Sequence, residues 1–155
     1  MNPDDPLQLA LSRLPHGPEF RFIDRLTQLD PGHSGRGEYL VRGDEQFLRG
    51  HFPGEPIFPG VLLVEAAAQL AGIVAQSDPQ IPALKNLKLT AFRSVKILGS
   101  AKPGETILLE AAIAGRLGNL VQARATARVG GAVVMTAEVT LSGDGEGEKA
   151  EKLKG

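Results

Sequence analysis

Two side chains of this protein are suited to proton transfer, and both lie in or beside one apolar segment. Between residues 61 and 75 every residue is apolar or glycine except Glu65 and Gln69. A carboxylate among apolar side chains is costly unless it is paired or protonated, so a buried Glu65 would favour its neutral acid form. His51 precedes the segment in a loop rich in glycine and proline, and a neutral imidazole can accept a proton near physiological pH. The two residues could therefore serve as an acid and a base.

Residue types alone leave structural roles open for the same side chains. His51 could simply bond to its loop backbone, and Glu65 could join a buried polar network or meet a charge across a subunit interface. Gln69 lies one helical turn after Glu65 and could orient its carboxyl group or a water. The amides of Gly60 and Val61 fall in the expected first helical turn, where N–H groups lack intrahelical acceptors and can stabilise an oxyanion. Together these groups predict enolisation of a carbonyl compound with loss of a β leaving group, on an unspecified substrate.

One long helix and one sheet must position these groups. Residues 59–76 predict a helix, because a proline suits its start and Ser-Asp-Pro at 77–79 ends it. A helix that is apolar on all sides is expected to be buried on all sides. Alternating patterns and turn signals predict a short helix at 7–14 and strands at 20–29, 37–41, 87–98, 106–114, 120–129 and 132–141. The sum is an α+β domain, with an antiparallel sheet of about six strands around the helix and a second subunit covering the remainder.

Composition narrows the class of protein. The 155 residues suit one domain, taken as residues 1–143, followed by a flexible charged tail at 144–155. A net charge of -1 gives no reason to expect nucleic-acid binding. The absence of cysteine excludes thiolate chemistry, and three histidines without ligand spacing predict no metal site. The apolar segment is shorter than the ~20 residues of a membrane span and no signal core is visible, so we expect a cytoplasmic protein without a membrane span.

The central block carries a family resemblance. Residues 50–61 read GHFPGEPIFPGV, and residues 65–69 read EAAAQ. These motifs strongly resemble the FabZ-type (3R)-3-hydroxyacyl-[acyl-carrier-protein] dehydratases of bacterial fatty-acid synthesis, which have the hot-dog fold. Further similarity lies in LPH at 14–16, Phe20, IDR at 23–25, DEQF at 44–47, FR at 92–93 and PGE at 103–105. The likeness covers roughly residues 10–141.

The resemblance implies a role for each matching position. His51 would remove a proton from C2 of an acyl thioester, Glu65 would protonate the C3 hydroxyl as it leaves, and the Gly60 amide would polarise the carbonyl. The substrate would arrive on the phosphopantetheine arm of acyl carrier protein, so no separate cofactor is expected. In the family the His and the Glu of one site come from different subunits of a dimer, and the dimers commonly form hexamers. Glu65 in place of an aspartate favours dehydration without isomerisation.

Other residues and departures from the family pattern bear on the partner and the substrate. Arg93, Lys96 and Lys102 could attract the acidic carrier protein, although a solvated basic face explains them equally well. Pro18 stands where the family often has a tyrosine that gates the acyl tunnel, and residues 98–102 lengthen a loop. The alternatives are another hot-dog enzyme, such as an enoyl-CoA hydratase or acyl thioesterase, or a non-catalytic acyl-binding subunit.

Overall fold

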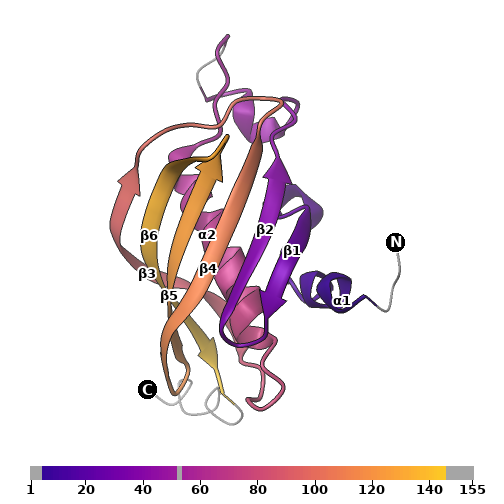
Figure 1. The fold of residues 1–155 in the computed structure, drawn as a ribbon, viewed down its shortest axis with the longest axis vertical. Helices are drawn as coiled ribbons and strands as arrows, with labels where there is room; N and C mark the ends of the chain where they lie inside the picture. Colours follow the sequence, from indigo (N-terminus) through magenta and orange to yellow (C-terminus); the bar gives the residue numbers. More distant parts are fainter. Residues whose placement is uncertain (1–4, 52–53, 146–155) are drawn as a thin grey trace.

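The computed structural model describes residues 5–51 and 54–145. Within them the elements are α1 (Pro6–Ser12), β1 (Arg25–Asp30), β2 (Ser34–Leu40), α2 (Gly60–Gln76), β3 (Lys85–Ile97), β4 (Thr106–Leu117), β5 (Leu120–Val129) and β6 (Ala132–Asp144), with 3-10 turns η1 (Pro18–Phe20) and η2 (Gln46–Leu48). The six strands form one antiparallel sheet in the order β1-β2-β4-β5-β6-β3, and the sheet curves around α2 (Figure 1). The predicted α+β architecture is confirmed.

The core lies between α2 and the concave face of the sheet. Along β5 the buried residues alternate with exposed or half-buried ones, which are polar except Leu120, as a strand with one solvated face requires. Three of the buried positions in β5 are alanines: Ala123, Ala125 and Ala127. Alanines of α2 are buried as well, including Ala67 and Ala71. Small residues on both elements allow the helix to lie close to the strands.

One face of α2 is not covered by the described chain, and this is the part of the helix that a second subunit is expected to cover. Val61 is 77% exposed, and Glu65, Gly72 and Gln76 are partly exposed. Their spacing of four, seven and four residues places them on a single helix face. The sheet packs against the other faces, so this stripe depends on something outside the chain or on a ligand for cover.

The first predicted strand begins later than the sequence pattern indicates. Residues 20–24 are not part of β1, because the backbone at Phe20 and Phe22 bonds to α2 instead of a neighbouring strand. Gln69 Nε2 donates to the Phe20 carbonyl at 2.8 Å, and the Phe22 amide donates to Gln69 Oε1 at 3.0 Å. This segment therefore lies across α2, with the Phe22 ring buried among other aromatic rings.

The last strand, β6, is longer than the sequence pattern indicates. β6 extends to Asp144, whose carboxylate accepts a hydrogen bond of 2.9 Å from Asn86, so this residue belongs to the domain and not to a tail. The remaining tail at 146–155 lies outside the described residues. None of the described helices is long and apolar enough to cross a membrane.

β3 is an edge strand with an unusual degree of exposure. Within the described chain it pairs with β6 on one side only, and none of its residues is buried. Phe92, in its middle, is 61% exposed. A long exposed edge strand presents backbone N–H and C=O groups that can pair with a strand of another chain.

Candidate functional site

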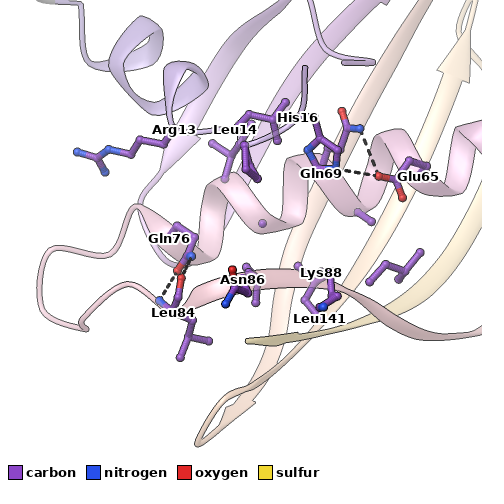
Figure 2. A pocket seen from close by; sticks show the side chains of 16 residues that line it. Arg13, Leu14, His16, Glu65, Gln69, Gln76, Leu84, Asn86, Lys88 and Leu141 are labelled. Atoms are coloured by element: carbon purple, nitrogen blue, oxygen red, sulfur yellow. Dashed lines mark hydrogen bonds and ion pairs between the residues drawn. The ribbon is translucent and has the colours of Figure 1, made fainter. Parts of the chain in front are cut away.

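A pocket of about 460 Å³ lies along the uncovered face of α2 (Figure 2). It is bounded by α2, by the first half of β3 and by the segment at residues 13–16. Its wall is mostly apolar, with Leu14, Ala68, Ile73, Leu87, Leu89 and Leu141 among the lining residues. Polar side chains also line it: Glu65, Gln69 and His16 lie toward one end, Gln76 and Asn86 lie toward the other, and Lys88 lies between them.

One carboxyl oxygen of Glu65, Oε1, is in contact with polar groups of the protein, and the other, Oε2, has no donor among the described residues. Its side chain is 21% exposed. Oε1 accepts a hydrogen bond of 3.3 Å from Gln69 Nε2 and lies 3.3 Å from His16 Nε2 (Figure 2). No described residue donates to Oε2. The carboxyl group is thus oriented by contacts on one side and available on the other.

Gln69 is fixed by backbone groups before it meets Glu65. Its side chain is nearly inaccessible, with 3% of the residue exposed. Because the Phe22 amide can only donate, the atom facing it is the amide oxygen, and the Phe20 carbonyl must then receive the NH2 group. The same NH2 group is therefore the one that reaches Glu65.

His16 was not predicted as a site residue. Its carbonyl accepts a 2.6 Å hydrogen bond from Arg21 Nε, and its ring stacks on Phe20 with 6.0 Å between centroids. The sequence offered one signal, the LPH motif, but residue spacing gave no reason to bring His16 to Glu65, which lies 49 positions away in the chain.

His51 lies in the loop that precedes α2, and it is not among the residues that line this pocket. Its Nδ1 is 2.9 Å from the Ile57 carbonyl oxygen. Because a carbonyl can only accept, Nδ1 carries the proton of the neutral ring and Nε2 is the basic nitrogen. The structure thus sets the tautomer of His51 without bringing it to Glu65 in one chain.

A hydrogen-bonded cluster holds the start of the loop that carries His51. Glu45 accepts from the Tyr39 hydroxyl at 2.8 Å and from the amides of Arg42 at 3.1 Å and Gly43 at 2.6 Å. Burial opposes ionisation of Glu45, but these hydrogen bonds hold its pKa below the ordinary value. Burial, followed by the bond to Glu45, raises the pKa of the Tyr39 hydroxyl.

Gly60 and Val61 begin α2, and the N-cap residue Pro59 offers no side-chain acceptor. Their amides have no acceptor among the described residues, as expected for a first helical turn. A Cβ at Gly60 would lie 3.3 Å from Ile97 Cγ2, so glycine also allows the end of β3 to pack against the helix start. These amides remain candidates for binding a developing oxyanion.

The three basic residues predicted to meet a carrier protein differ in their surroundings. Arg93 Nε forms an ion pair of 2.6 Å with Glu138. Lys96 and Lys102 are exposed and form no ion pair within the described chain. The longer loop at 98–102 is anchored on both sides, because the Leu98 amide donates to Val134 and the Ala101 carbonyl accepts from Phe58.

Neither a tyrosine gate nor a metal site is found near the pocket in the described residues. Pro18, at the usual position of the gating tyrosine, begins η1 and does not line the pocket. No cluster of three or more His, Asp or Glu side chains able to hold a metal occurs in the part of the chain that the structure describes.

A curved antiparallel sheet around one long helix is the hot-dog architecture, and comparison with solved structures agrees. The dehydratase heterocomplex ApeI:P from Xenorhabdus doucetiae aligns with a TM-score of 0.76 at 14% identity, covering 94% of this chain and 97% of that one. Zebra fish thioesterase superfamily member 2 aligns with a TM-score of 0.65, also at 14% identity, covering 88% of this chain and 91% of that one. These likenesses establish the fold, and the different names of the two proteins show that the fold alone does not define an activity.

Sequence comparison is more specific. Residues 14–138 match the FabA-like domain family. The 3-hydroxyacyl-[acyl-carrier-protein] dehydratase FabZ of Thermoanaerobacter sp. (strain X514) is 36% identical over 126 residues, which are 81% of this chain and 88% of the relative. The chain therefore belongs to the FabA-like family and, within it, to the FabZ-type dehydratases, which are hydro-lyases. The resemblance predicted from the GHFPGEPIFPGV block is confirmed.

Proposed function

We propose that the protein dehydrates (3R)-3-hydroxyacyl-acyl carrier protein to the trans-2-enoyl thioester in fatty-acid biosynthesis. The observation that carries this proposal is the carboxyl group of Glu65 at one end of an apolar pocket, with protein partners on only one of its two oxygens. The apolar wall suits an acyl chain, and the open oxygen suits protonation of a leaving hydroxyl. The names of the curated relatives supply the substrate class.

The proposed reaction uses three groups of the protein. His51 Nε2 takes the proton from C2, and the negative charge that develops on the thioester oxygen is held by the amide of Gly60, with Val61 beside it. The electron pair then forms the C2–C3 double bond while the C3–O bond breaks. Glu65 gives its proton to the departing hydroxyl, which leaves as water. The protons on both side chains return to their starting positions through solvent, so no oxidant, metal or cofactor takes part.

We infer that the His51 of each site comes from a second copy of the chain. In one chain His51 lies in the loop before α2 and the pocket with Glu65 is lined without it. The uncovered stripe of α2 and the unpaired edge of β3 are adjacent surfaces that a second copy would cover. Pairing of two β3 strands would extend the sheet and bring the partner subunit's His51 toward Glu65.

Mixing two impaired variants tests this arrangement together with the reaction. His51→Ala and Glu65→Gln should each lower the turnover of 3-hydroxybutyryl-carrier protein by about 10²-fold or more. If each site combines the two subunits, a mixed dimer has one intact site, and random mixing should restore about a quarter of the wild-type turnover. Mixed subunits that stay impaired would place both residues in one subunit. Release of free thiol in place of the enoyl product would instead indicate a thioesterase.

The proposed dimer through β3 has its own test, with a matched control in the chain. Phe92→Asp places a charge on the exposed β3 edge and should convert the dimer to a monomer in light scattering, with loss of activity. Leu117→Asp changes an even more exposed apolar residue, 80% accessible at the end of β4, and should leave the dimer intact. An unchanged dimer in the Phe92 variant would exclude this interface.

We propose that acyl carrier protein docks beside the start of α2. Lys96 lies next to Ile97, which packs on Gly60, and Lys102 follows the residue that bonds to Phe58. Lys96→Glu with Lys102→Glu should raise KM for the carrier-bound substrate and leave KM for a small pantetheine thioester unchanged. Lys85→Glu, at the opposite end of β3, is the control. An equal rise for both substrates would contradict a carrier-specific role.

A further inference from the structure

We propose that His16 is a positioning residue for the acid Glu65, a role that rests on the proposed dehydration. His16 Nε2 lies 3.3 Å from Glu65 Oε1, the oxygen that also accepts from Gln69 Nε2, so the Nε2–H tautomer would direct its proton to that oxygen. Both donors then occupy the same oxygen, so the acid carries its proton on Oε2, the oxygen that receives no donor from the described chain. His16 thereby decides which oxygen of Glu65 faces the substrate with a proton.

The surroundings of the His16 ring favour this tautomer. Nε2 lies 3.3 Å from Glu65 Oε1, whereas Nδ1 is inaccessible to solvent and has no hydrogen-bond partner in the described part of the chain. A proton on Nδ1 would be a buried donor without an acceptor. A proton on Nε2 leaves only a lone pair unpartnered. Of the two neutral tautomers, Nε2–H is therefore the one that leaves no buried donor without an acceptor.

The position of His16 is set independently of Glu65. Arg21 binds the chain on both sides of Pro15, with Nε donating to the His16 carbonyl at 2.6 Å and Nη2 donating to the Leu14 carbonyl at 3.2 Å. Phe20, whose ring stacks on the imidazole, is in turn held by Gln69. Backbone contacts thus place the imidazole before any ligand is present, as a preorganised donor requires.

This contact would matter most as Glu65 loses its proton. A donor gains strength when its acceptor becomes charged, so the bond from His16 to Oε1 is stronger once the carboxylate forms. Interactions that strengthen toward the transition state accelerate the reaction without tightening substrate binding. Removing one donor to a charged acceptor should therefore lower kcat by about 10- to 100-fold. KM should change little.

Kinetic comparison of His16→Leu with His16→Gln tests the role. Leucine removes the donor and should give the full loss of kcat, whereas the glutamine amide can occupy the position of Nε2 and should recover most of it. His33→Leu, at an exposed turn residue, is the control for loss of a histidine and should match the wild type. A folded His16→Leu variant with wild-type kcat would overturn the proposal. So would a His16→Gln variant as slow as His16→Leu.

A second measurement needs no catalytic activity. The chain has three histidines, at positions 16, 33 and 51, so ring ¹⁵N NMR spectra can be assigned with single variants. We expect the Nε2–H tautomer for His16 at neutral pH, replaced by a mixture of tautomers in Glu65→Ala. An Nδ1–H tautomer, with Nε2 unprotonated, would overturn the proposed contact. A protein inactive on hydroxyacyl thioesters that still shows the Nε2–H signature would overturn the dehydration and keep the contact.

Discussion

Two glutamates flank the loop that carries His51, and their hydrogen bonding differs in one decisive respect. Glu45, before the loop, has both carboxyl oxygens occupied, by the Tyr39 hydroxyl and the amides of Arg42 and Gly43. Glu65, after the loop, has two contacts on Oε1 and none from the described chain on Oε2. A fully occupied carboxylate can only hold structure together. A carboxyl group with one oxygen open to a pocket can also exchange a proton.

The same substitution at both glutamates should have opposite consequences for activity and stability. Glu65→Gln keeps the shape of the side chain and removes the acidic proton, so kcat should fall by about 10²- to 10⁴-fold. Its free energy of unfolding should change by less than ~1 kcal/mol, because one oxygen already lacks a protein partner. Glu45→Gln should keep kcat within about tenfold of the wild type, since Glu45 only supports the loop. Turnover of 3-hydroxybutyryl-carrier protein and urea unfolding report the two effects, and a larger loss of kcat in the Glu45 variant would reverse the assignment.

Local sequence patterns were sufficient for most of the fold. Proline at the start and Ser-Asp-Pro at the end bound α2 at almost the same residues in the prediction and in the structure, Gly60–Gln76. Gly130 and Gly131 are a two-residue turn signal, and the structure has the hairpin from β5 to β6 at these residues. Such signals are carried by residues within a few positions of each other. The prediction was wrong for residues 20–24, whose apolar pattern suits a strand, because the competing partner, Gln69, is distant in sequence.

The site was less accessible to sequence reasoning for the same physical reason. Gln69 lies one helical turn from Glu65, so a contact between them followed from helix geometry. His16 reaches Glu65 only because the segment before β1 crosses α2, and no periodicity encodes that crossing. The separation of His51 from the pocket of its own chain likewise depends on tertiary structure. The family resemblance, and not spacing, suggested that two subunits share a site.

The contribution of Glu45 to the free energy of unfolding should depend on pH, because its carboxylate supports the loop only when it is ionised. Its hydrogen bonds outweigh burial and lower its pKa from the model-compound value of 4.5. A lowered folded pKa means that the stabilisation is present above about pH 4.5 and is lost as the pH falls through the folded value. Glu45→Gln should therefore reduce the free energy of unfolding by about 1–2 kcal/mol at neutral pH.

Denaturant titrations across the acidic range would measure this difference. The gap between Glu45→Gln and the wild type should narrow as the pH falls below the folded pKa of Glu45, because the wild-type carboxylate is then also neutral. Glu38→Gln, on β2, controls for the loss of a surface charge. A gap that stays constant down to the lowest pH would mean that packing of the side chain, and not its ionised form, supports the loop.

The smallest expected effect on activity concerns Gly72, at the part of the pocket away from Glu65. Gly72 lies two helical turns further along α2, about 10 Å away, and lines the same pocket. A Cβ there would lie 3.7 Å from Leu87 Cδ2 and 3.8 Å from Leu141 Cδ1, so Gly72→Ala fits without strain. Gly72→Val adds an isopropyl group to the pocket, and valine is no worse than glycine in a helix.

If an acyl chain occupies this pocket, the valine variant should discriminate by chain length. The kcat/KM for 3-hydroxydecanoyl-carrier protein should fall by about tenfold, because the distal methylenes lose their space, while that for the 3-hydroxybutyryl substrate stays near the wild-type value. For Gly72→Ala, the kcat/KM for the 3-hydroxydecanoyl substrate should lie between the values of the wild type and of Gly72→Val. The ratio of the two kcat/KM values isolates this effect from changes at Glu65, which would alter both substrates equally. Equal losses for both chain lengths would mean that the added side chain disturbs α2 and the acid it carries, and that the acyl chain does not run along this face of the helix.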